Sequence, residues 1–256
     1  PMIDVSIVIP VYNEEESLPD LFGRLFPVVE ALGRPAEVIF VNDGSSDGSL
    51  RMLLEEARRR DYVRVVDFNG NFGQHMAIMA GFSMAKGNKI ITLDADLQNP
   101  PEEIPRIVAE MDRGHDMVGT YRVMRKDPAI TRKIPSKLVN WVTNRITGLN
   151  IRDYGCMLRG YDRRIVDLIN MCKETTTFLP ALGKRFAQNP VEIPVPHEER
   201  HKGTSKYGLY RLIRLNFDLM TGFSMVPLQA VTITGLLVSA GSLVFALYLL
   251  IRRLLV

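Results

Sequence analysis

The chain has 256 residues, which is enough for one large α/β domain with an additional segment. It carries 32 Lys and Arg against 29 Asp and Glu, a formal net charge of +3, and the basic residues are dispersed, so charge does not indicate a nucleic-acid-binding protein. The two cysteines, Cys156 and Cys172, lack the regular spacing of a disulfide framework or a zinc site, and we expect two reduced thiols.

Strand and helix patterns alternate through the first half of the chain. We expect no signal peptide before them, because Pro1–Asp4 has neither a basic region nor an apolar core. Strands are predicted at Val5–Ile9, Val38–Val41, Val63–Val66, Ile90–Leu93 and Met117–Thr120. Helices are predicted between them at Leu18–Val29, Asp47–Ala57, Gly73–Met84 and Pro101–Met111. This alternation predicts a mostly parallel sheet with helices on both faces.

Polar motifs follow three of these strands, at Tyr12-Asn13-Glu14, Asn42-Asp43-Gly44 and Asp94-Ala95-Asp96. Ligands of such sheets bind beyond the carboxyl ends of the strands, so we expect the motifs to lie at the ligand-binding edge. The carboxylates of Glu14 and Asp43 can accept hydrogen bonds from a base or a ribose. The segment after Asp43 also fits a turn that leads into a helix cap, and both interpretations can hold.

Asp94 and Asp96 are the strongest chemical signal. In an extended segment residues i and i+2 point the same way, so the two carboxylates would share a small volume and require a cation or a proton. Magnesium and manganese prefer such oxygen ligands, and the Gln98 amide could add another. A polar loop that merely ends a strand is the alternative, but the acidic ends of two earlier strands favour the metal site.

The second half of the chain is less regular and ends in an apolar segment. Tyr121–Phe186 is basic and irregular, and a basic amphipathic helix is predicted within 207–226. Val231–Ile251 is uncharged and exceeds the length of about 20 residues that a membrane span needs. We therefore expect a catalytic domain at 1–206, an interfacial helix at 207–226 and a transmembrane helix at 229–256, with further membrane segments beyond it.

Six short motifs resemble family 2 glycosyltransferases of the GT-A fold and, within that family, the branch that glycosylates polyprenyl phosphates. The motifs of the family are Val8–Glu14, Asn42–Asp47 and Asp94–Gln98. The motifs of the branch are Asn71–His75, Asp153–Cys156 and Gly203–Tyr207. The resemblance covers nearly the whole chain. It is greatest to the group that transfers 4-deoxy-4-formamido-L-arabinose to undecaprenyl phosphate in lipid A modification of lipopolysaccharide. The alternatives are dolichyl-phosphate mannose synthases and undecaprenyl-phosphate hexosyltransferases.

The resemblance implies an inverting transferase that uses a UDP-sugar, a polyprenyl phosphate and Mg²⁺ or Mn²⁺ at the cytoplasmic face of the inner membrane. It implies nucleotide binding by Pro10, Tyr12, Glu14, Asp43 and Asp94, and metal and diphosphate binding by Asp94, Asp96 and Gln98. It implies acceptor-phosphate binding by Arg122, Arg132 and Ser136, and a loop over the donor diphosphate with Arg200, Ser205 and Lys206. The lipid bilayer is an expected partner and nucleic acid is not, and a homo-oligomer is left open.

Asp96 and Asp153 are the catalytic candidates. Asp153 occupies the place where relatives that glycosylate hydroxyl groups keep a base. A phosphate monoester has a second pKa of about 6 and is already ionised near neutral pH, so it needs no strong base. We therefore expect Asp153 to orient the acceptor, or a residue that binds it.

Other functional classes fit less well. A dinucleotide-binding oxidoreductase would need glycines after the first strand, and Val11–Ser17 has none. A processive polysaccharide synthase would carry Q-x-x-R-W, whereas the only tryptophan is Trp141 in another context. A UDP-binding module without catalysis is disfavoured by the full acidic set. His197–His201 matches the zinc-protease pattern H-E-x-x-H, but nearby prolines and Gly203 oppose the helix that this pattern needs.

Overall fold

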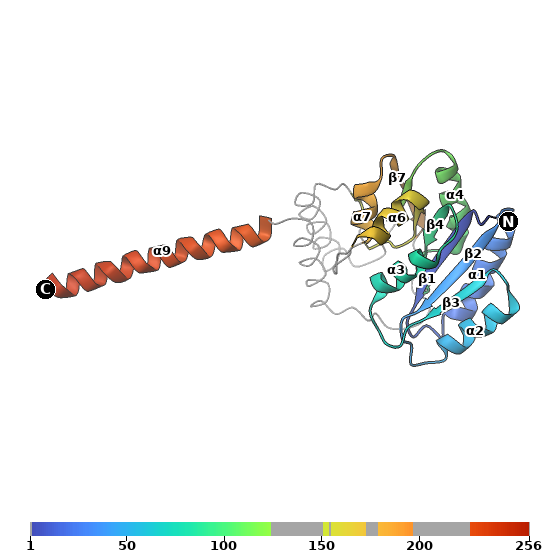
Figure 1. Cartoon of the computed structure of the whole chain (residues 1–256), viewed down its shortest axis with the longest axis horizontal. Helices are drawn as coiled ribbons and strands as arrows, with labels where there is room; N and C mark the ends of the chain where they lie inside the picture. The colour runs from blue at the N-terminus through green and yellow to red at the C-terminus, as the bar shows by residue number, and fades with distance from the viewer. Residues whose placement is uncertain (1, 124–150, 154, 173–178, 197–225, 256) are drawn as a thin grey trace.

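The computed structural model describes residues 2–123, 151–153, 155–172, 179–196 and 226–255 (Figure 1). An α/β domain carries the N-terminus, and a long helix, α9, extends away from it. The predicted boundary at residue 206 and the predicted helix at 207–226 lie outside the described residues, apart from residue 226.

Among the described residues, one seven-stranded sheet has the order β3-β2-β1-β4-β6-β5-β7. The strands are β1 (Val5–Val11), β2 (Ala36–Asn42), β3 (Val63–Asp67), β4 (Lys89–Thr92), β5 (Met117–Val123), β6 (Arg159–Asp162) and β7 (Pro190–Pro196). Strands β1 to β4 are parallel, β6 is antiparallel to β4 and β5, and β7 is parallel to β5. The predicted mostly parallel sheet is confirmed.

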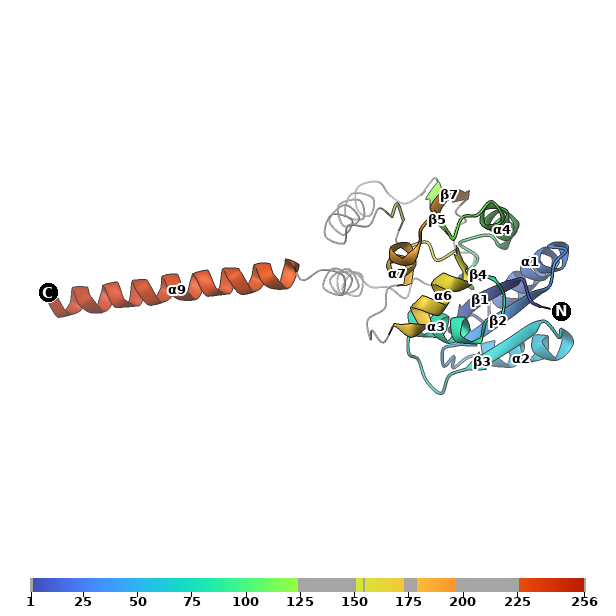
Figure 2. The ribbon, with the colours of Figure 1, turned by 45° about the horizontal axis from the view of Figure 1, so that its top comes forward.

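Helices cover both faces of the sheet, as predicted (Figures 1 and 2). They are α1 (Leu18–Ala31), α2 (Ser49–Arg59), α3 (Gln74–Met84), the short 3₁₀ helix η1 (Pro101–Glu103), α4 (Ile104–Asp112), α6 (Arg163–Met171) and α7 (Leu179–Phe186). The prediction that a helix begins at Asp47 was wrong by two residues, because the Asp47 carboxylate instead accepts the Ser49 backbone N–H at 3.0 Å just before α2. Strands β6 and β7 and helices α6 and α7 were not predicted.

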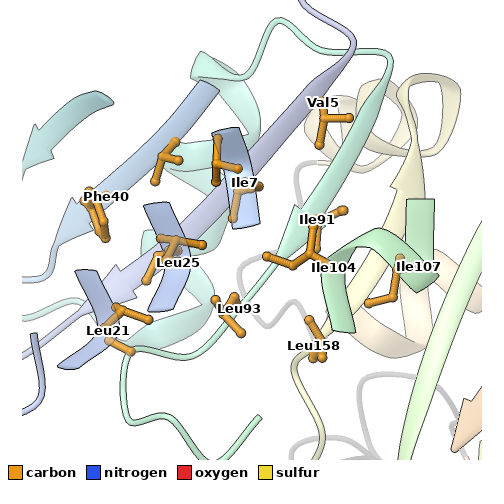
Figure 3. Close-up of a cluster of buried hydrophobic side chains, with 14 of the residues drawn as sticks. Val5, Ile7, Leu21, Leu25, Phe40, Ile91, Leu93, Ile104, Ile107 and Leu158 are labelled. Atoms are coloured by element: carbon orange, nitrogen blue, oxygen red, sulfur yellow. The ribbon is translucent and has the colours of Figure 1, made fainter. Parts of the chain in front are cut away.

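The alternation of side chains along each central strand makes two hydrophobic cores, one on each face. On one face, Ile7 of β1 and Phe40 of β2 pack with Leu21 and Leu25 of α1 and with Ile104 of α4 (Figure 3). On the other face, the β1 residue Val8 and neighbours from β2 pack against α3, α6 and α7. The sheet is therefore buried on both sides, and its carboxyl edge is left to bind ligands.

Helix α9 (Val226–Leu255) contains the predicted apolar segment. Val231–Leu255 has a mean hydropathy of 2.1, and every side chain described in α9 is exposed. By length and composition this helix can cross a membrane, and its exposed apolar surface needs an apolar environment.

Candidate active site

The three polar motifs lie at the same edge of the sheet, as predicted. In the parallel register Val11 of β1 pairs with Asn42 of β2, and Val8 pairs with Thr92, the last residue of β4. The residues that follow these strands, including Asp43 and Asp94, therefore emerge side by side at the carboxyl edge.

Hydrogen bonds join the turn after β1 to the turn after β2. The Asn13 backbone N–H donates to Ser45 Oγ at 3.0 Å, and the Ser46 backbone N–H donates to Asn13 Oδ1 at 2.7 Å. Asn13 has a φ of 52°, a left-handed conformation that asparagine tolerates better than most residues. The Glu14 backbone N–H donates to Ser49 Oγ at 2.9 Å. These bonds give the predicted nucleotide-binding turn a defined shape.

The predicted nucleotide-binding residues Pro10, Tyr12 and Glu14 run from the end of β1 into this turn. Pro10 is partly buried within the strand, and Tyr12 is 38% exposed at its end. The Glu14 carboxylate accepts the Ser17 hydroxyl at 2.7 Å at the start of α1. An exposed aromatic ring beside a carboxylate can contact a base and its polar edge.

Asp43 also has a structural role that the sequence did not show. It is 3% exposed, and its Oδ1 accepts the Phe72 backbone N–H at 2.7 Å. Its Oδ2 accepts the Gly73 backbone N–H at 2.9 Å and Asn71 Nδ2 at 3.0 Å. Asp43 therefore fixes the loop that precedes α3 against the carboxyl edge of the sheet.

The Asp94–Asp96 segment has a different conformation from the one expected. Strand β4 ends at Thr92, Leu97 has a φ of 61°, and Asp96 Oδ1 accepts the Gln98 backbone N–H at 3.1 Å. The expectation of an extended segment was wrong, because the chain turns here. Asp94 Oδ1 accepts Gln74 Nε2 at 2.6 Å.

In the part of the chain that the structure describes, no group of three or more His, Cys, Asp or Glu side chains could hold a metal ion. Two carboxylates and the amide of Gln98 still match the oxygen preference of Mg²⁺ and Mn²⁺. Such ions usually complete their coordination with substrate phosphates and water, so two protein carboxylates can suffice.

Arg122 and Asp153 form a buried ion pair. Arg122 Nε donates to Asp153 Oδ2 at 2.6 Å, and Arg122 Nη2 donates to Oδ1 at 2.9 Å. The two side chains are only 13% and 9% exposed. Burial lowers the pKa of Arg122, but the bonds to Asp153 outweigh this and the pKa is raised, so the guanidinium stays charged. The structure thus pairs a predicted acceptor-phosphate residue with a predicted catalytic residue.

The other predicted phosphate-binding residues lie outside the described residues: Arg132, Ser136, Arg200, Ser205 and Lys206. The histidines of the H-E-x-x-H pattern and Trp141 lie outside them too.

Arg159 was missed by the sequence analysis. It is 1% exposed at the start of β6, where Nε donates to the Cys156 carbonyl oxygen at 2.8 Å and Nη2 to the Asp153 carbonyl oxygen at 2.6 Å. These bonds fix the loop that carries Asp153. Gln74 was named only within a motif, and its bond to Asp94 has no local signal in the sequence.

Among the described residues both cysteines are free, as expected. Cys156 is buried, which raises the pKa of its thiol, and its Sγ lies 3.3 Å from Asn99 Oδ1. It is part of the packing beneath the Asp153 loop.

Comparisons with known proteins agree with this architecture. The model of glycosyl transferase family 2 matches residues 6–169. The chain is 51% identical over 255 residues to the undecaprenyl-phosphate 4-deoxy-4-formamido-L-arabinose transferase of Klebsiella pneumoniae subsp. pneumoniae, covering 99% of this chain and 78% of that protein.

Solved structures show the same fold at low identity. Glucosyl-3-phosphoglycerate synthase from Mycobacterium tuberculosis, in complex with Mn²⁺, UDP and phosphoglyceric acid, superposes with a TM-score of 0.62 at 14% identity, over 85% of this chain and 76% of that one. Residues 1–349 of TarS from S. aureus superpose with a TM-score of 0.51 at 16% identity, over 78% of this chain and 59% of that one.

Proposed function

Because this chain belongs to glycosyl transferase family 2, we propose that it transfers 4-deoxy-4-formamido-L-arabinose from a UDP-linked donor to undecaprenyl phosphate. The observation that carries this proposal is the 51% identity to a transferase of that name, over 99% of this chain. The acidic edge of the sheet and the buried Arg122–Asp153 pair suit a reaction between two phosphate-bearing substrates.

The chemistry needs little proton transfer. An oxygen of the ionised acceptor phosphate attacks the anomeric carbon, the bond from that carbon to the β-phosphate oxygen breaks, and UDP leaves with the electron pair. A phosphate monoester with a second pKa of about 6 is already a nucleophile at neutral pH. The protein therefore has to orient the two substrates and stabilise the charge that develops on UDP.

The residues at the carboxyl edge divide these tasks. The turn at Tyr12 and Glu14 receives the uridine, and Asp43 holds the loop beside it. Asp94 and Asp96, with the amide of Gln98, would hold Mg²⁺ or Mn²⁺, which neutralises charge on the diphosphate when bound. Gln74 orients the Asp94 carboxylate through its 2.6 Å bond.

Arg122 binds the acceptor phosphate, and Asp153 positions the guanidinium of Arg122. A guanidinium has five N–H donors, and Asp153 accepts two of them, which leaves donors for a phosphate. The two-point bond with Asp153 fixes the plane of the guanidinium, so less conformational freedom is lost when phosphate binds. Arg132 and Ser136, and the loop with Arg200, Ser205 and Lys206, would complete the phosphate contacts.

The membrane helix anchors this site to its lipid substrate. We place the α/β domain on the cytoplasmic side, because nucleotide sugars are made in the cytoplasm. Helix α9 would then cross the inner membrane, and the amphipathic segment at 207–226 would lie on the headgroups.

Mass spectrometry of lipid products tests the proposal. The full chain in detergent is incubated with undecaprenyl phosphate and a panel of UDP-sugars, with Asp96→Asn as the inactive control. We expect one product, from UDP-4-deoxy-4-formamido-L-arabinose. Equal or faster transfer from UDP-glucose would instead identify a hexosyltransferase.

A further inference from the structure

Helix α3 is largely apolar on both of its sides. No Asp, Glu, Lys or Arg occurs between Asp67 and Lys86. The helix buries one side against the sheet through Ala77, Ile78, Gly81 and Phe82. The outer side, together with Phe72 just before the helix, forms what we call the α3 face: Phe72, Met76, Met79, Ala80 and Met84, with Ser83 as an exposed polar residue among them.

Three side chains of the α3 face are well exposed, whereas Met79 and Ala80 are partly buried against the core. Phe72 is 59% exposed, Met76 51% and Met84 42%. Phe72 is held in place by an edge-on contact with Phe68, whose ring centroid lies 5.6 Å away. Burial lowers the pKa of His75 to about 4, so the only ionisable side chain of this segment is neutral at neutral pH. The whole segment is therefore uncharged.

Other helices of the domain differ in this respect. Arg24 of α1 pairs with Glu102 at 2.8 Å, Arg51 of α2 pairs with Glu55 at 3.1 Å, and Arg106 of α4 is 47% exposed. A helix that faces water on one side normally carries such charges there. An exposed helix face that consists mainly of large apolar side chains is instead normally covered by other apolar material.

The position of α3 indicates what covers it. The helix begins at the active site, because Gln74 Nε2 lies 2.6 Å from Asp94 Oδ1 and the Phe72 backbone N–H binds Asp43. Phe72 and Met76 therefore flank the site directly. In both views α3 lies on the side of the α/β domain from which α9 departs, whereas α1, α2 and α4 lie farther from α9 (Figures 1 and 2).

We propose that the α3 face rests in the interfacial layer of the bilayer, with Phe72 and Met76 entering the boundary between headgroups and acyl chains. This inference rests on the proposed function, in which the acceptor is a membrane lipid. An aromatic ring suits the membrane–water boundary, and flexible methionines adapt to a disordered apolar phase. Contact there brings Asp94 and its neighbours to the level of the acceptor phosphates.

Lipid quenching tests the contact without turnover. A polarity-sensitive fluorophore is attached to Phe72→Cys or Met76→Cys in the full chain, in a Cys172→Ser background, and the protein is reconstituted in vesicles that contain a lipid quencher below the headgroup. Arg51→Cys on α2 is the matched control. We expect strong quenching at positions 72 and 76 and none at 51.

Two results would overturn the proposal. One is quenching at 72 and 76 that does not exceed that at 51. The other is a blue-shifted fluorophore that the lipid quencher does not reach, which means that protein and not lipid covers the face. Because this measurement needs no product, it remains informative if the proposed sugar transfer fails.

The kinetics of two variants distinguish a membrane contact of the α3 face from a direct role of that face in the active site. Met76→Gln should raise the KM for undecaprenyl phosphate in vesicles several-fold and leave the KM for a short, water-soluble polyprenyl phosphate unchanged. Leu54→Gln, on the exposed side of α2, should change neither value. An equal loss by Met76→Gln on both acceptors would contradict the membrane contact.

Discussion

The Arg122–Asp153 ion pair joins two residues to which the proposed function gives linked roles. Both side chains are largely buried, and removing one partner of a buried pair leaves the other charge uncompensated. Arg159 fixes the backbone at Asp153, because its guanidinium donates a hydrogen bond to the carbonyl oxygen of Asp153. In the proposed function Asp153 would act on the acceptor through Arg122, and the expectation that it orients a residue that binds the acceptor stays a prediction.

The roles of the two aspartates can be separated by kinetics. Asp153→Asn should keep more activity than Asp96→Asn, because the amide oxygen can still accept one bond from Arg122. Arg122→Ala should raise the KM for lipid phosphate about tenfold or more, since a hydrogen bond to a charged group contributes about 1.5–3 kcal/mol. UDP binding should remain nearly unchanged in Arg122→Ala.

Steady-state kinetics of these three variants at several pH values provide the measurement. A general base would give a different result. In that case Asp153→Asn would be the most damaged variant, and the wild-type rate would follow one basic group whose pKa differs from that of the acceptor phosphate.

Metal dependence is the second prediction at this scale. EDTA should abolish transfer, and Mg²⁺ or Mn²⁺ should restore it, because Asp94 and Asp96 offer a divalent ion hard oxygen ligands. Gln74→Ala should raise the Mn²⁺ concentration for half-maximal rate by about tenfold or more, the usual effect of losing a residue that orients a ligand. Undiminished turnover in EDTA would rule the metal out.

At the scale of elements, α3 packs closely on β1. A Cβ atom added to Gly81 would lie 2.2 Å from Val8 Cγ1, and the branched side chain of Val8 cannot move aside within the core. A side chain at position 81 would therefore push α3 away from the sheet. This movement would also disturb Gln74, the residue that contacts Asp94.

Gly81→Ala should destabilise the domain by about 1–3 kcal/mol, the usual effect of overpacking. Gly23→Ala is the control, because Gly23 lies within α1 with nothing within 4 Å of an added Cβ, and it should stabilise the domain by about 0.5–1 kcal/mol. The Tm of the two variants in detergent should therefore move in opposite directions. Equal shifts would show that α3 and β1 are not in close contact.

At the scale of the whole molecule, the proposed function requires the α/β domain and its lipid substrate to meet at a membrane. A chain truncated after Lys206 lacks α9, so it should lose membrane association and much of its activity on the long-chain acceptor. It should still bind UDP, because the turn to which we assign nucleotide binding belongs to the α/β domain. Cell fractionation and calorimetry with UDP measure the two properties. Recovery of the full chain in the soluble fraction without detergent would contradict this prediction.

The sequence by itself determined the features that depend on local pattern. Hydrophobic periodicity identified the four parallel strands β1 to β4, and their carboxyl ends showed where Glu14, Asp43 and Asp94 would meet. A single uncharged stretch identified the apolar helix α9. Each of these properties is carried by residues that are close together in the chain.

The tertiary structure alone decided the features that depend on distant partners. Strand β6 runs antiparallel between β4 and β5, and its first residue is the buried Arg159, a pattern that does not read as a strand. Arg122 and Asp153 are 31 positions apart, and Gln74 and Asp94 are 20 apart, so only folding brings each pair to bonding distance. The sequence shows which side chains are polar or charged. Which hydrogen-bond or ion-pair partner each of them has depends on how the strands and loops pack.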